Sequence, residues 1–166
     1  MLYTVTTYAQ SDSKKEKIIA DSKEAKEEFL KADEAMGGLF DKSYGYVIFP
    51  NVGKGGVGVG GAAGNGAAYE QGVLIGTAKL TQVSVGLQLG GQSYREVIFF
   101  ENKEAMDRFK DNRVELSAQV SAVAAASGAS ANAKYNEGVM VFTMQKGGLM
   151  YEASVGGQKF KFEKGK

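Results

Sequence analysis

Glycine alternates with valine between residues 56 and 60, and this short run constrains the fold more than any other part of the chain. It follows strand-forming residues from Tyr44 to Phe49 and the single proline, Pro50. Alternate side chains of a strand point to opposite faces, so one face carries Val57 and Val59 and the other is bare backbone. Glycine inside a strand marks a bulge, a bend or the close approach of another backbone. We therefore expect a second layer, or an extended apolar ligand, to lie flat against this segment.

Two glycine patterns in the same stretch imitate a dinucleotide-binding loop. GxGxxG occurs at positions 53, 55 and 58 and again at 56, 58 and 61. Such a loop needs a helix directly after it, with the helix N-terminus facing the pyrophosphate. The residues that follow have no helical period, and Lys54 lacks the next Ser or Thr of a Walker loop. The sequence therefore argues against nucleotide binding.

The composition argues against an enzyme and against a cofactor. The chain has 166 residues, enough for one domain with a sizeable core, and it contains neither histidine nor cysteine. Catalytic triads, histidine proton shuttles and the usual zinc or iron sites need those side chains. Lysine and arginine total 20 against 19 acids, so no global field attracts nucleic acid.

The first residues, MLYTVTTYAQ, differ in character from the charged segment that follows. Ala9 before Gln10 resembles the end of a secretory signal, although the basic start and full apolar core of a signal are missing. Residues 1–11 are expected to be either a signal-peptide remnant of a secreted or periplasmic protein, or a disordered N-terminus of a cytoplasmic one. Residues 12–166 are expected to form a single domain.

Residues 12–36 form the clearest predicted helix, and Gly37 and Gly38 are expected to end it. Its narrow buried stripe consists of Ile18, Ser22, Ala25, Phe29, Ala32 and Met36. The other faces mix lysines and acids, whereas a helix that lies on a membrane carries a strongly basic polar face. The pattern favours docking on the domain's own sheet, with membrane insertion as the alternative.

The rest of the chain reads as short strands separated by turns. The predicted strands are residues 67–69, 73–77, 79–89, 97–100, 114–120, 139–144, 149–155 and 159–162, with a strand fading into a loop at 122–133. The strand at 97–100 is apolar on both faces and should be central, and Asn102 is a good N-cap for a short helix near 102–110. The predicted fold class is α+β: a predominantly antiparallel, Gly-rich sheet, sandwich- or barrel-like, with an N-terminal amphipathic helix.

The last predicted strand places Lys159 and Lys161 on one face and Phe160 and Phe162 on the other. These lysines could contact anionic headgroups at an acidic membrane surface. The alternative is an edge strand that lysine protects against edge-to-edge pairing, and because this protection is widespread, the pattern favours it.

Three segments, taken together and in this order, resemble the SYLF family, a lipid-binding and actin-associated module. They read SYGYVIFPNVGKGGVGVGGAAGNGAAYEQG, LTQVSVGLQLGGQSYREVIFFENKEAMDRFK and KGGLMYEASVGG, and the resemblance extends from about Leu39 to Phe162. It implies a mostly β domain preceded by a helix, and binding to phosphoinositides or other acidic lipids; eukaryotic members also bind actin filaments. The chain is similar to the stand-alone bacterial branch, since no SH3 or FYVE domain accompanies it here.

The resemblance also supplies candidate headgroup-binding residues. Lys54 stands where the family has a lysine before its Gly-rich strand, and it is the first candidate. Further candidates are the helix lysines Lys14, Lys15 and Lys17 and the terminal lysines Lys159 and Lys161.

The sequence and the resemblance together predict a non-enzymatic module that binds anionic phospholipid or a membrane surface. The alternative is an extracytoplasmic structural or protein-interaction domain, whose flat Gly/Ala-rich face meets a protein partner or a second copy of the chain. Neither hypothesis involves nucleic acid, a metal or a cofactor.

Overall fold

The structure is a computed structural model that describes residues 2–53, 62–82, 93–114, 122–146 and 158–165, with the side chains described from Asp12 onward. The helices are α1 (Leu2–Ala32), α2 (Met36–Lys42), α3 (Lys103–Lys110) and the 3-10 helix η1 (Ala129–Asn132). The strands are β1 (Gly45–Gly53), β2 (Ala62–Glu70), β3 (Val73–Gln82), β4 (Tyr94–Phe100), β5 (Val123–Ala124), β6 (Val139–Gln145) and β7 (Gln158–Lys164).

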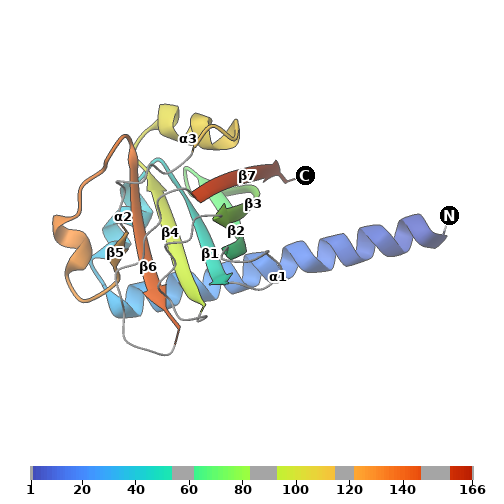
Figure 1. Cartoon of the computed structure of the whole chain (residues 1–166), viewed down its shortest axis with the longest axis horizontal. Coiled ribbons are helices and arrows are strands. Elements are labelled where there is room, and N and C mark those ends of the chain that lie inside the picture. The colour runs from blue at the N-terminus through green and yellow to red at the C-terminus, as the bar shows by residue number, and fades with distance from the viewer. Residues whose placement is uncertain (1, 54–61, 83–92, 115–121, 147–157, 166) are drawn as a thin grey trace.

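The described strands form one sheet in the order β5-β6-β4-β1-β2-β3-β7 (Figure 1). All neighbouring strands are antiparallel except β5 and β6, which run parallel. Strand β4 lies between β1 and β6 and is covered on both faces, as the apolar run at 97–100 predicted. The α+β class and the mainly antiparallel sheet are confirmed, and the described strands form an open sheet rather than a closed barrel.

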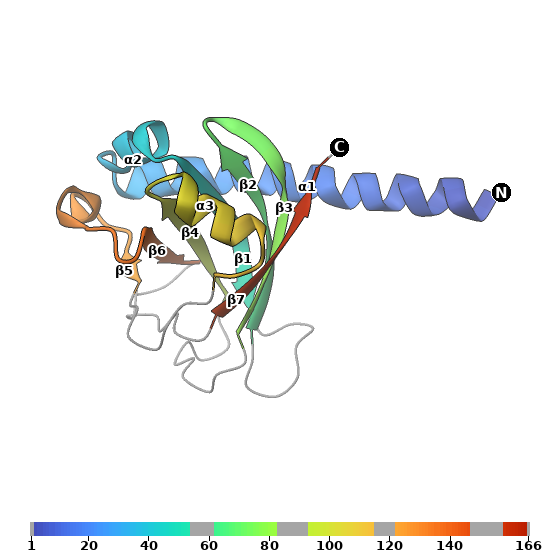
Figure 2. The ribbon, with the colours of Figure 1, turned by 90° about the horizontal axis from the view of Figure 1, so that it is seen from above.

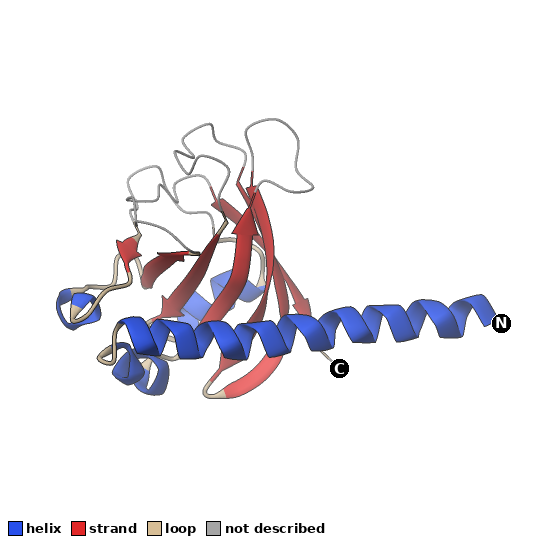
Figure 3. Cartoon of the chain, turned by 90° about the horizontal axis from the view of Figure 1, so that it is seen from below, coloured by secondary structure: helices blue, strands red, loops and turns tan. Residues whose placement is uncertain are grey.

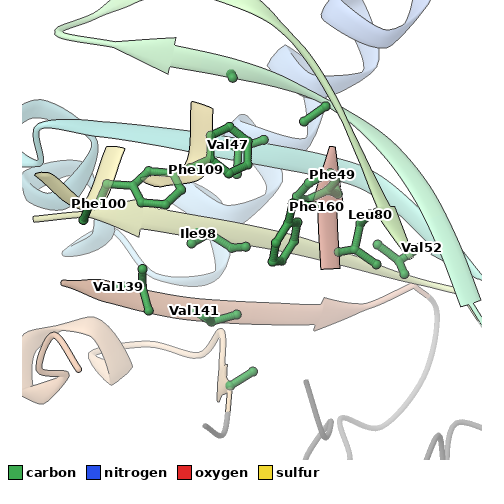
Figure 4. Packing of buried hydrophobic residues seen from close by; sticks show 14 of the residues in the cluster. Val47, Phe49, Val52, Leu80, Ile98, Phe100, Phe109, Val139, Val141 and Phe160 are labelled. Atoms are coloured by element: carbon green, nitrogen blue, oxygen red, sulfur yellow. The ribbon is translucent and has the colours of Figure 1, made fainter. Parts of the chain in front are cut away.

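The sheet coils around an inner core that α3 covers (Figures 2 and 4). The rings of Phe49 in β1 and Phe160 in β7 lie 5.9 Å apart, although two strands separate β1 from β7 in the sheet. Phe109 of α3 lies 6.1 Å from Phe160 and adds a third ring to this core. The helix starts as predicted, because the Asn102 side chain accepts a hydrogen bond from the Ala105 N–H at 2.9 Å.

The opposite, outer face of the sheet is covered by α1 and α2, and α1 crosses the strands and projects beyond them (Figure 3). Ala25 and Phe29 of α1 are buried against this face. Ser22 is fully buried, and its hydroxyl donates to the carbonyl of Ile48 at 3.3 Å. The predicted stripe therefore docks on the sheet, which confirms that interpretation of the helix.

Both predicted ends of the long helix are wrong. The helix begins at Leu2 rather than at Asp12, because extending a formed helix adds one hydrogen bond per residue even through residues of modest propensity. It ends at Ala32, and Gly37 and Gly38 lie inside α2 instead of ending α1. The division of the chain into residues 1–11 and 12–166 remains a prediction.

The buried carboxylate of Asp33 explains the early end of α1. It accepts hydrogen bonds from the backbone N–H groups of Ala35 (3.2 Å), Gly128 (3.2 Å) and Ser130 (2.7 Å). Burial acts to raise its pKa, but these hydrogen bonds outweigh burial and hold the pKa below its usual value. Asp33 thus competes with the helix for backbone donors and joins the end of α1 to the segment around η1.

Glycines of β2 and β3 permit close approach between neighbouring strands. A Cβ on Gly66 would overlap the carbonyl of Ile48, and one on Gly64 would lie 2.6 Å from the carbonyl oxygen of Asn51. These contacts come where the β1–β2 register shifts between Ile48 and Asn51. The glycine–valine run at 56–60 lies outside the described residues, as does the predicted strand at 149–155. Most of the predicted strands at 114–120 and 79–89 also lies outside them.

Candidate functional site

A groove runs between α1 and the outer face of β2, β3 and β7, and its volume is about 570 Å³. We call it the basic groove. The residues that matter for its chemistry are Lys14, Asn65, Thr77, Lys79, Lys161 and Glu163. Three cations and one acid face the same space, so the groove is suited to an anion.

Two of the cations are held together by the ladder between β3 and β7. Lys79 is directly opposite Lys161 in the register, and both side chains are exposed. Their neighbours Leu80 and Phe160 are buried in the inner core, and this fixes the lysines on the outer face. Directly opposed like charges in an antiparallel pair are destabilising, so the pair gains from an anion placed between them.

The third cation comes from the helix. Because Ala25 and Phe29 fix α1 on the outer face, the earlier turns of the helix pass over β3 and β7, where Lys14 lines the basic groove. Lys15 binds the acid at the edge of the groove, with its Nζ 3.6 Å from Glu163 Oε1. This ion pair offsets the one negative charge in the lining.

The structure assigns different surroundings to the remaining predicted headgroup lysines. Lys17 forms an ion pair with Asp21 at 2.6 Å, and the hydrogen bond to that carboxylate raises the lysine pKa. Lys159 is exposed and pairs with Thr81. It lies two residues before Lys161 in β7, on the same face of the sheet. Lys54 lies outside the described residues.

The structure therefore brings together Lys14 and Lys161 of the predicted set and adds Lys79, which the sequence analysis missed. In the sequence, the sign of Lys79 was a lysine at the start of the predicted strand 79–89. Its side chain points to the face opposite that of its neighbour Leu80. Its place in the basic groove depends on the pairing of β3 with β7, and no local sequence pattern specifies that pairing.

The interior of the sheet contains a second polar cluster that the sequence analysis also missed. Glu96 is completely buried, and Gln158 Nε2 donates to its Oε1 at 2.9 Å. The same amide lies 3.2 Å from the Tyr94 hydroxyl and 3.2 Å from Gln82 Oε1. Gln158 thus joins β7 to β4 through the interior, although the two strands are not neighbours in the sheet.

Burial raises the pKa of Glu96 to about 8, although the hydrogen bond from Gln158 acts to lower it. Its second oxygen, Oε2, has no hydrogen-bond partner among the described residues. The hydroxyl of Thr143, which faces Glu96 across the β4–β6 ladder, also lacks one there. A neutral carboxyl suits this site, because it places no charge in the interior and its O–H group is an additional hydrogen-bond donor.

Within the described ranges, no cluster of three or more acidic side chains could hold a metal ion. None of the helices described is both long enough and apolar enough to cross a bilayer. In the described part of the Gly/Ala-rich stretch after residue 61, Ala67 and Ala68 are fully buried and Ala63 is half-buried.

Comparison with known proteins matches the chain to a family model and to a relative. The model of the Ysc84 family, described as a Las17-binding protein actin regulator, matches residues 81–165. Beta cell expansion factor A of Aeromonas veronii is 32% identical over 127 residues, which cover 76% of this chain and 48% of that protein. The chain thus spans about half the length of this relative. The family match covers half of the chain and includes β4, α3, β6 and β7, and it confirms the resemblance seen in the sequence: the chain belongs to the Ysc84 family of SYLF domains.

Proposed function

We propose that this chain is a non-enzymatic module that binds anionic phospholipid headgroups, and that phosphate oxygens are held in the basic groove. The observation that carries the proposal is the placement of Lys79 opposite Lys161, with Lys14 brought over them by α1. Three lysine ammonium groups provide up to nine N–H donors, and a phosphate offers several acceptor oxygens. Membership of a family associated with lipid and actin binding in eukaryotes supports the same conclusion.

A protein partner is the second candidate, and the family description favours it because that description names binding to Las17. The proposal for this chain is a protein-interaction or structural domain outside the cytoplasm. The two candidates differ in what they require: a headgroup site needs acidic lipid, whereas a protein site binds without any lipid.

The first test is pelleting with phosphatidylcholine vesicles that do or do not contain phosphatidylglycerol. We expect binding only to the acidic vesicles, and we expect it to weaken as salt rises, because salt screens exposed charges. Equal binding to both kinds of vesicle would rule out the electrostatic mechanism, and capture of a protein partner without lipid would favour the second candidate.

The second test replaces Lys79 and Lys161 together by glutamine. A lysine near an acidic surface contributes ~1 kcal/mol, so the double variant should bind acidic vesicles about 30-fold more weakly. Its thermal stability should be equal to or above that of the unmodified chain, because the substitution removes a like-charge pair. Lys134→Gln, at an exposed position after η1, is the matched control and should bind normally. Unchanged binding by the double variant would remove the basic groove from the mechanism.

A further inference from the structure

The tip of the β2–β3 hairpin exposes two adjacent apolar side chains. Val73 is 63% exposed and Leu74 is 40% exposed, and no other large hydrophobic side chain in the described residues is exposed to this degree. The turn before them consists of Gln71 and Gly72, whose φ angles of 53° and 79° fit a two-residue turn with both central residues left-handed. The turn places Val73 and Leu74 at the very end of the hairpin, as the first two residues of β3, with their side chains on opposite faces of the strand.

An apolar groove of about 200 Å³ continues from this tip along the same strand. It is lined by Ile19 of α1 and by Leu74 and Ile75 of β3. Thr77 and Glu163 line both this apolar groove and the basic groove. The apolar groove and the basic groove are therefore contiguous. Both are lined in part by α1, the helix that crosses the sheet in Figure 3.

The two acids that flank the hairpin tip are both paired with lysines. Glu70, the last residue of β2, accepts a hydrogen bond from Lys110 at 2.9 Å. Glu163 is paired with Lys15 at 3.6 Å. The tip consequently carries no unopposed negative charge that would repel an anionic surface. In a phospholipid leaflet the acyl chains lie directly below the phosphates. The apolar hairpin tip could therefore contact acyl chains while the neighbouring basic groove contacts phosphates.

We propose that the hairpin tip, Val73 and Leu74, enters the acyl boundary of an anionic phospholipid membrane while the basic groove holds the phosphates above it. This inference rests on the proposed function and adds the orientation in which the chain meets the membrane. It assigns the apolar part of the contact to the hairpin, whereas the buried stripe of α1 remains on the sheet.

The chain has no tryptophan, so Leu74→Trp introduces a single fluorescent reporter at the tip. With acidic vesicles its emission should shift to the blue, and lipids brominated on the upper acyl carbons should quench it. Lys134→Trp, after η1, is the control and should keep the emission of a water-exposed indole. A second variant, Val73→Ser with Leu74→Ser, removes apolar surface from exposed positions and should lower the affinity for acidic vesicles about tenfold while leaving the fold intact.

The outcomes separate the two proposals. Pelleting with acidic vesicles, but without blue shift or quenching at position 74, would keep the headgroup function and overturn the hairpin insertion. A blue shift without vesicles that grows with protein concentration would mean that the tip docks on a second copy, and this would also overturn it. Failure of the unmodified chain to bind acidic vesicles would overturn both proposals.

Discussion

Replacing Glu96 by glutamine should remove a large part of the pH dependence of the free energy of unfolding. Glu96 is completely buried, and its pKa is raised from 4.5 to about 8. Glutamine has nearly the same shape, can accept the same hydrogen bond from Gln158, and cannot ionise. The difference between the two proteins therefore isolates the titration of this one group.

The sign and size follow from proton linkage. Below about pH 4.5 the carboxyl is protonated in both the folded and the unfolded chain, so its full contribution to stability is present. Between that pH and about pH 8, unfolding releases one proton, and the free energy of unfolding falls by ~1.4 kcal/mol per pH unit. From about pH 5 to about pH 8, the glutamine variant should gain on the order of 3 kcal/mol relative to the unmodified chain. The phenol of Tyr94 stays neutral over this range, because burial raises its pKa.

Urea unfolding curves, followed by circular dichroism at several pH values, measure this difference. Glu101→Gln, at the exposed position directly after β4, is the matched control and should track the unmodified chain. Parallel pH profiles for the unmodified chain and Glu96→Gln would refute the reasoning, because they would mean that the carboxyl is ionised in the folded protein.

Two further substitutions test the outer face and the sheet. Asp33→Ala leaves three backbone N–H groups without their acceptor, so it should cost about 3 kcal/mol in urea unfolding near neutral pH. Because the folded pKa of Asp33 is lowered, this cost should diminish as the pH falls through that pKa, and a cost that persists in acid would contradict the assignment. Gly66→Ala should lower the stability by about 3 kcal/mol, since its Cβ would overlap the carbonyl of Ile48. Gly38→Ala, in α2 with no atom within 4 Å of the added Cβ, should raise the stability by about 0.5–1 kcal/mol, and equal effects at the two glycines would contradict the close-approach argument.

Local patterns predicted the elements of this fold well. The apolar run at 97–100 identified the central strand, and Asn102 identified the start of α3, because burial on both faces and capping are encoded in neighbouring residues. The alternation of Phe160 with Lys159 and Lys161 placed each of these residues on the face where it lies. The end of α1 was missed because it depends on Asp33, whose partners Gly128 and Ser130 are far away in the sequence.

The candidate site was only partly predictable for the same reason. The lysines of α1 and β7 were visible as charged positions, but the pairing of β3 with β7 made Lys79 their neighbour. Glu96 carried a weak signal as an acid beside the apolar run at 97–100, and its importance arises from Gln158 reaching it across the coiled sheet. Residues that meet through tertiary pairing leave no periodic trace in the sequence.

The position of β7 in the sheet has a consequence for how the chain acquires its structure during synthesis. Residues 158–164 pair with β3, whose first half is separated from them by more than half of the sequence, and Phe160 completes the inner core. Contacts of such long sequence separation slow folding, because the loop between the strands must close before they form. The ribosome must therefore release the chain at least as far as residue 164 before the sheet can be completed, and until then the inner core around Phe49 and Leu80 lacks the cover that Phe160 provides.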